Sequence, residues 1–133
     1  MKLHHYGFLT DDMSKCIAAY ELLGYRKISS YFDEIRMIDI VFLQNGNDSA
    51  LLELVSPKSE NSVVFKMLNK HRNSLYHSCY EVENLDAAIE KLCDKAFLLI
   101  DAPKPAIAFE NRKVAFLFSQ FTGIIELLES NEV

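Results

Sequence analysis

Alternating apolar and polar positions predict short strands along the whole chain, and helically spaced apolar residues predict two helices between them. The first 28 residues indicate a strand, a helix that begins after Asp11 or Asp12 and stops at Gly24, and a second strand. Aspartate accepts hydrogen bonds from the free amides of a helix start, and glycine readily takes the left-handed conformation that ends a helix. The pattern therefore predicts a strand, a helix and a strand in that order.

The same pattern returns in the second half of the chain. Residues 4–28 align without a gap on residues 76–100, and the physical character of the positions repeats more than their identity. Asn84 takes the place of the capping aspartate. Ala96 stands where the first copy has Gly24, which predicts that the second helix ends in a different way.

The match continues beyond the helices into two further strands of each copy. Residues 41–43 lie over residues 115–117, and residues 52–55 lie over residues 125–128. Asn45-Gly46-Asn47-Asp48 is typical of a tight antiparallel hairpin between the two strands of the first copy. Each copy is therefore a strand, a helix and three strands.

These elements predict an α+β fold. Two tandem βαβββ modules would form a cup-shaped, curved sheet of roughly eight strands, because one module alone cannot bury both its helix and its sheet. We expect a single domain over residues 1–133, with module one at about 1–57, a connecting helix at about 58–72 and module two at about 73–130.

Composition limits the function classes without changing this architecture. The chain has 133 residues, 50% of them hydrophobic and 25% charged, as expected of a globular domain. A formal net charge of −5 without a lysine or arginine cluster argues against nucleic acid as a partner. The apolar stretches are too short for a membrane span and the opening residues lack a secretory leader, so we expect a soluble, cytoplasmic protein.

Three cysteines are present, and none of them belongs to a Cys-x-x-Cys pair. This spacing predicts neither a disulfide framework nor a thiolate zinc site. We expect all three to be small buried side chains.

Ionisable side chains stand in the middle of four apolar strands. His5 and His77 occupy matching positions in the two copies, and so do Glu53 and Glu126. An ionised carboxylate in an apolar strand needs a partner, because burial of an unpaired charge is costly. Two imidazoles and two carboxylates that converge on one cleft suit one divalent ion of nickel, cobalt, manganese, iron or zinc. We therefore predict that these four side chains are metal ligands.

The segments around these residues resemble one protein superfamily. They read LHHYGFLTDDMSKCIAAYELLGY, LLELVSP, YHSCYEVENLDAAIEKL and KVAFLFSQFTGIIELLE. They are similar to the vicinal oxygen chelate superfamily, which includes glyoxalase I, methylmalonyl-CoA epimerase, extradiol dioxygenases and the bleomycin and fosfomycin resistance proteins. The likeness covers almost the whole chain and is closest to the epimerase and glyoxalase I branches. It implies the same four metal ligands.

The resemblance also implies a reaction. In this superfamily the metal takes a substrate carbonyl oxygen and stabilises the enolate that forms when the neighbouring carbon loses a proton. By resemblance, Glu126 is the catalytic base or acid, Glu53 is its counterpart in module one, and Asp39 is a second acid on the opposite face of the substrate. A solvent-facing strand residue is an equally good interpretation of Asp39.

Three functions follow as hypotheses. The first is a metal-dependent isomerase or epimerase that abstracts a proton next to a metal-bound carbonyl of a small acyl substrate. The second is a glyoxalase I-type lactoylglutathione lyase, favoured by Glu53 at a position where epimerase-like members often have glutamine. The third is a non-enzymatic small-molecule binding protein of the drug-resistance kind.

Two segments differ from the family pattern and bear on the substrate. Residues 102–109 are markedly apolar, and the loop at 119–123 is short and uncharged. Both features favour a greasier or carrier-tethered substrate over a free coenzyme A or glutathione adduct. Dimers are common in the superfamily, so a homodimer is compatible with this chain.

Overall fold

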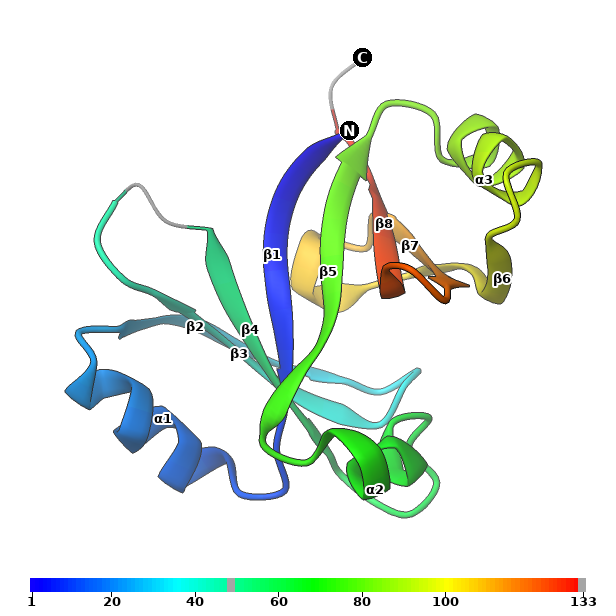
Figure 1. The fold of residues 1–133 in the computed structure, drawn as a ribbon. Helices are drawn as coiled ribbons and strands as arrows, with labels where there is room; N and C mark the ends of the chain where they lie inside the picture. The colour runs from blue at the N-terminus through cyan, green and yellow to red at the C-terminus, as the bar shows by residue number, and fades with distance from the viewer. Residues whose placement is uncertain (48–49, 132–133) are drawn as a thin grey trace. The chain divides into compact units, whose positions relative to one another are not determined.

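A computed structural model describes residues 1–47 and 50–131, and Asp48 of the predicted hairpin signal lies outside them. The elements follow the predicted order, which confirms the α+β class and the two βαβββ modules (Figure 1). Module one contains β1 (Lys2–Leu9), α1 (Met13–Leu22), β2 (Arg26–Asp33), β3 (Ile38–Gln44) and β4 (Leu51–Pro57). Module two contains β5 (Ser74–Val82), α3 (Leu85–Cys93), β6 (Leu98–Pro105), the 3₁₀ turn η2 (Ile107–Phe109), β7 (Lys113–Ser119) and β8 (Gly123–Glu129).

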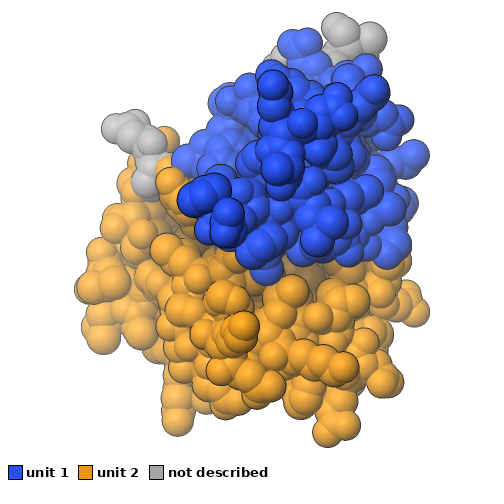
Figure 2. All heavy atoms as spheres, turned by 45° about the vertical axis from the view of Figure 1, so that its right-hand side comes forward, with its two compact units in different colours: residues 1–4, 77–133 blue, residues 5–76 orange. Residues whose placement is uncertain are grey.

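The chain divides into two compact units (Figure 2). In the unit of residues 5–76 the strand order is β2-β3-β4-β1, with β1 parallel to β4 and the other pairs antiparallel. In the unit of residues 1–4 and 77–133 the order is β6-β7-β8-β5, with β5 parallel to β8. Each unit thus repeats the same four-stranded topology. The single-domain assignment, the module bounds and the cup stay predictions.

One face of each sheet packs against the helix of its own module. In module one, Val41, Leu43, Leu52 and Leu54 form a buried cluster with Cys16 of α1. Because successive strand side chains point to opposite faces, the residues between them lie on the other side of the sheet, which we call the distal face. The equivalent cluster of module two contains Val82, Leu85, Ala88, Ala115, Leu117, Ile125 and Leu127.

The two helices begin with the capping residues that the sequence predicts. The side chain of Asp12 accepts a hydrogen bond from the amide of Lys15 at 3.1 Å. The side chain of Asn84 accepts one from the amide of Ala87 at 3.0 Å. Each cap satisfies an amide that has no partner inside its helix.

The two helices also end in the same way, so the prediction of a different end for the second helix is wrong. Gly24 has φ +100°, and Ala96 adopts the same left-handed region with φ +70°. The amide of Phe97 then donates to the carbonyl of Leu92 at 3.1 Å. Phe97 packs on the core of module two, and we infer that this packing holds Ala96 in a conformation that alanine alone disfavours.

Both edge strands carry a bulge at the same point of the repeat. The pairing of β2 with β3 shifts between Lys27 and Ser29, and that of β6 with β7 shifts between Leu99 and Asp101. The extra residue in the second case is Ile100, which lies opposite Ile28 in the alignment of the two copies. A bulge bends its strand and raises the local twist, so the repeat extends to this irregular feature.

The connecting segment is less helical than predicted. It contains only the 3₁₀ turn η1 (Phe65–Met67) and the short helix α2 (Leu68–His71). The residues before them bond to the turn between β2 and β3: the amide of Lys58 donates to Met37 O at 2.9 Å and the hydroxyl of Ser62 to Arg36 O at 3.0 Å. These bonds replace helical ones over residues 58–62.

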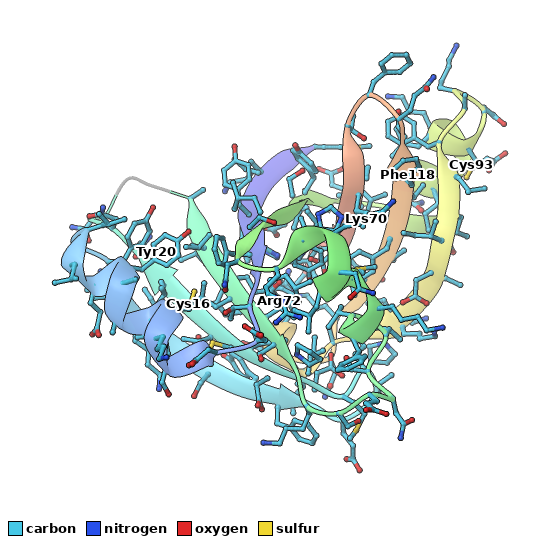
Figure 3. All side chains as sticks on the ribbon, turned by 60° about the horizontal axis from the view of Figure 1, so that its bottom comes forward. Cys16, Tyr20, Lys70, Arg72, Cys93 and Phe118 are labelled. Carbon is cyan, nitrogen blue, oxygen red and sulfur yellow. The ribbon has the colours of Figure 1, made fainter. Side chains whose placement is uncertain are left out.

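The cysteines follow the sequence prediction in two of three cases. Cys16 and Cys79 are buried, whereas Cys93 is exposed. Figure 3 labels Cys16 and Cys93. Burial raises the pKa of the Cys16 thiol above its ordinary value.

No helix within residues 1–47 and 50–131 is long and apolar enough to cross a membrane.

The shared helix end gives a test of the repeat. We expect Ala96→Gly to stabilise the protein by about 1 kcal/mol, because glycine adopts the left-handed conformation without the steric cost of alanine. Gly24→Ala should destabilise it by about 1–2 kcal/mol for the opposite reason. Urea unfolding of both variants measures this, and equal midpoints for Ala96→Gly and the wild type would contradict it.

Candidate functional site

Module one places a histidine and a glutamate side by side on its distal face. The parallel pairing of β1 with β4 sets Gly7 opposite Glu53. His5 lies two residues before Gly7 and therefore on the same face. His5 Nε2 is 3.4 Å from Glu53 Oε1, and the two residues are only 0% and 4% exposed.

Module two repeats this arrangement. The parallel pairing of β5 with β8 sets Cys79 opposite Glu126, and His77 lies two residues before Cys79. His77 Nε2 is 3.2 Å from Glu126 Oε1, and the two residues are 6% and 4% exposed. The halves differ at the paired position, where module one has Gly7 and module two has a buried thiol.

A phenylalanine packs edge-on against each histidine. The ring centroids of His5 and Phe42 are 5.6 Å apart at 78°, and those of His77 and Phe116 are 5.7 Å apart at 87°. Phe42 pairs with Glu53 across β3 and β4, and Phe116 pairs with Glu126 across β7 and β8. Each half-site is thus a histidine, a glutamate and an aromatic wall from three adjacent strands.

No role for these phenylalanines follows from the sequence alone, although the sequence carries a signal for them. Phe42 and Phe116 are the central residues of segments 41–43 and 115–117, which align between the two copies. An aromatic ring at matching places in both copies is a weaker sign than a histidine, because it is expected in any core. Only the strand register shows that both rings contact a candidate ligand.

Each pair has the chemistry of a metal-binding half-site. A carboxylate does not enter a buried position without a positive partner, because its desolvation is costly. An imidazole nitrogen beside a carboxylate oxygen offers the mixed nitrogen and oxygen donors that divalent transition metals bind. A protonated histidine is the alternative partner for each glutamate, and metal analysis distinguishes the two states.

Asp39 lies apart from this chemistry. It shares a face of β3 with Val41, which packs in the cluster under α1, whereas Phe42 is on the distal face. Its carboxylate is 3.5 Å from Lys58 Nζ, and its side chain is 40% exposed. The structure therefore brings His5 to Glu53 but does not bring Asp39 to that pair, which agrees with the interpretation of Asp39 as a solvent-facing strand residue.

This chain is similar to a known protein family, to characterised sequences and to solved structures. A family model described as the Glyoxalase/Bleomycin resistance protein/Dioxygenase superfamily matches residues 4–116. An ethylmalonyl-CoA/methylmalonyl-CoA epimerase of Cereibacter sphaeroides is 26% identical over 131 residues, which cover 96% of each chain.

Solved structures share the fold over nearly the whole chain. The methylmalonyl-CoA epimerase from Mycobacterium tuberculosis has a TM-score of 0.83 and 24% identity, over 98% of this chain and 89% of that one. A variant of the Streptomyces coelicolor methylmalonyl-CoA epimerase, in complex with 2-nitronate-propionyl-CoA, has a TM-score of 0.82 and 20% identity over 99% of both chains. At these identities the likeness establishes the fold.

The position of Asp39 gives a test of the face assignment. We expect Asp39→Asn to leave metal affinity unchanged, because Asp39 is on the helix-covered side of β3 and its carboxylate contacts Lys58. Glu53→Gln should weaken metal binding, because it removes a negative charge from the distal face. Titration of both variants with cobalt(II) measures this. A loss of affinity in Asp39→Asn equal to that in Glu53→Gln would contradict the assignment.

Proposed function

The chain belongs to the glyoxalase/bleomycin resistance protein/dioxygenase superfamily, as the sequence predicts, and from this premise we propose that it is an epimerase-type enzyme that acts on an acyl thioester. In this proposal one divalent metal ion is held by His5, Glu53, His77 and Glu126. The enzyme removes a proton from the carbon next to the thioester carbonyl and returns one to either face of that carbon.

One observation carries the proposal: two buried His–Glu pairs occur at equivalent places of a repeat. The nitrogen-to-oxygen distances are 3.4 Å and 3.2 Å, and the same strand pairing produces both. A structural role explains one buried pair with ease. Two matched pairs with matched aromatic walls favour a common ligand that both halves hold, and a divalent cation supplies the positive charge that the two carboxylates need.

The metal supplies Lewis-acid stabilisation of the negative charge that develops on the carbonyl oxygen. The protein's own groups move the proton. We assign Glu126 as the base that takes the proton from carbon, while the electron pair of the broken bond moves toward the carbonyl oxygen. Glu53, once it has taken a proton from the solvent and no longer acts as an anionic ligand, would deliver that proton to the opposite face, and the two carboxyl groups exchange roles for the reverse direction.

Burial of these groups serves the same chemistry. Glu53 and Glu126 are both 4% exposed, and Phe42 and Phe116 pair with them on the neighbouring strands. A dry site strengthens electrostatic interactions and protects a carbanionic species from stray protonation. Asp39 has no part in this assignment, so the two ligating glutamates are the acid and the base.

The comparisons support an acyl thioester as the substrate class. The Cereibacter sphaeroides relative is named for epimerisation of ethylmalonyl-CoA and methylmalonyl-CoA. The Streptomyces coelicolor structure contains an acyl-CoA analogue. We propose the same class of substrate here, with the acyl group left open.

A glyoxalase I-type lyase is the second candidate. The observation that favours it is the pair of carboxylates, because Glu53 occupies a position where epimerase-like members often have glutamine. Both reactions begin with loss of a proton next to a carbonyl oxygen. Activity on the hemithioacetal of methylglyoxal with several thiols, measured beside deuterium exchange into a thioester panel, decides between them.

The proposal predicts one metal ion for each chain. His5→Ala and His77→Ala should each lower metal affinity by at least the ~10–100-fold that loss of an outer-shell partner costs, because each removes one nitrogen ligand. His71→Ala, in the connecting segment, is the control and should retain the ion. Equilibrium dialysis followed by elemental analysis measures the occupancy. Unchanged occupancy in either ligand variant would contradict the shared site, whereas a wild-type protein that holds no ion would favour the metal-free binding protein.

The assignment of the base gives a separate prediction. Glu126→Gln should reduce the rate of alpha-proton exchange by about 10²–10⁴-fold, because the amide keeps an oxygen ligand but cannot accept the proton. Glu129→Gln on the same strand is the matched control and should leave the rate unchanged. Deuterium incorporation followed by mass spectrometry, at saturating metal, measures both. A Glu126→Gln rate close to that of the wild type would show that another group is the base.

A further inference from the structure

The connecting segment between the modules has a charge opposite to that of the chain. The chain has a formal net charge of −5, yet residues 58–72 contain four lysine or arginine side chains and one acidic side chain. The basic residues of this segment are spaced rather than consecutive, so they form no obvious cluster in the sequence. They are Lys58, Lys66, Lys70 and Arg72, with Glu60 as the acid.

Two of the four basic residues are already engaged. Lys58 Nζ is 3.5 Å from a carboxylate oxygen of Asp39, and Arg72 forms an ion pair with Asp11. Lys66 and Lys70 are exposed and form no ion pair with any residue in the part of the chain that the structure describes. Figure 3 labels Lys70 and Arg72 on this segment.

The backbone sets Lys66 and Lys70 on the same side of the segment. Val64, Met67 and Leu68 all have right-handed helical dihedral angles, so the turn of η1 continues into α2. Residues four apart in such a turn are neighbours, with roughly 5–6 Å between their Cβ atoms. Two ammonium groups at this spacing suit one phosphate group.

The segment is anchored rather than loose. Val64 and Leu68 are buried, and the Ser62 hydroxyl bonds to Arg36 O. At its other end the amide of Asn73 donates to Leu9 O at 2.7 Å. The segment therefore crosses from the turn between β2 and β3 to the end of β1, and its position in module one is fixed.

The segment meets β1, the strand of His5, at Leu9. His5 and the end of β1 at Leu9 are four strand residues apart, which is roughly 13 Å. The thioester sulfur of a pantetheine arm and its phosphate are separated by a chain of comparable length. The loop at 119–123 has no basic residue that could contact a phosphate.

We propose that Lys66 and Lys70 bind the phosphate of a phosphopantetheine arm that carries the acyl substrate. This inference rests on the proposed function and names how the carrier is recognised. The lysines contribute to affinity and leave the proton transfer to Glu126. Free coenzyme A and a carrier protein both present this phosphate, and the test separates them.

Equilibrium binding tests the contact without any need for turnover. We expect coenzyme A and 4′-phosphopantetheine to bind the metal-loaded protein about tenfold more tightly than pantetheine, because two exposed charge contacts contribute about 1–2 kcal/mol together. The double variant Lys66→Gln/Lys70→Gln should lose this preference and bind coenzyme A, 4′-phosphopantetheine and pantetheine with about equal affinity. Lys91→Gln/Lys95→Gln, which neutralises two exposed lysines four residues apart in module two, should retain it. Calorimetric titration at low and high salt measures all three proteins with each of these ligands and with an acylated, phosphopantetheine-bearing carrier protein.

The outcomes separate this inference from the proposed function. Equal affinity of the wild type for coenzyme A, phosphopantetheine and pantetheine would overturn the phosphate contact, and so would an unchanged preference in the Lys66→Gln/Lys70→Gln variant. An effect confined to an acylated carrier protein would indicate a protein contact and would also overturn it. If no thioester exchanges its alpha proton while the phosphate preference holds, the proposed reaction fails and the binding assignment stands.

Discussion

The register of one parallel strand pair determines the candidate site. In each module the first strand pairs with the last, and the histidine lies two residues before the position opposite the glutamate. This register puts a basic ring and a carboxylate on one face, deep enough that neither meets bulk water. A shift of one residue would turn either side chain to the opposite face. The burial of Leu52 and Leu54 in the core of module one, and of Ile125 and Leu127 in the core of module two, favours this register.

The burial of the two His–Glu pairs indicates a functional role rather than a contribution to stability. An apolar pair of the same size would stabilise the strands at least as well, because desolvation of a buried ion pair offsets its attraction. The chain nevertheless uses histidine and glutamate at 3.4 Å and again at 3.2 Å. A divalent ion that needs nitrogen and oxygen donors accounts for both pairs at once, and proton abstraction next to a carbonyl is chemistry that such an ion and a glutamate perform together.

The sequence predicted what depends on local pattern and repetition. The caps Asp12 and Asn84 could be read from it, and so could the matching strand positions of the two histidines and two glutamates, because each has a counterpart in the other copy. It failed where distant packing decides: Ala96 takes a left-handed conformation beside the packed Phe97, and the connecting segment bonds to the turn between β2 and β3 instead of forming a full helix. The role of Asp39 was ambiguous because side chains alternate between the two faces of a strand. Only the pairing register shows on which face of β3 Asp39 lies.

The central claim is that the ligands of both modules hold one ion, and X-ray absorption at the zinc edge of the zinc-loaded protein tests it most directly. The account predicts two imidazole nitrogens and carboxylate oxygens at about 2.0–2.2 Å, and no sulfur at about 2.3 Å despite Cys79 on the same face as His77. A spectrum with a single imidazole, or with a sulfur ligand, would contradict the shared site.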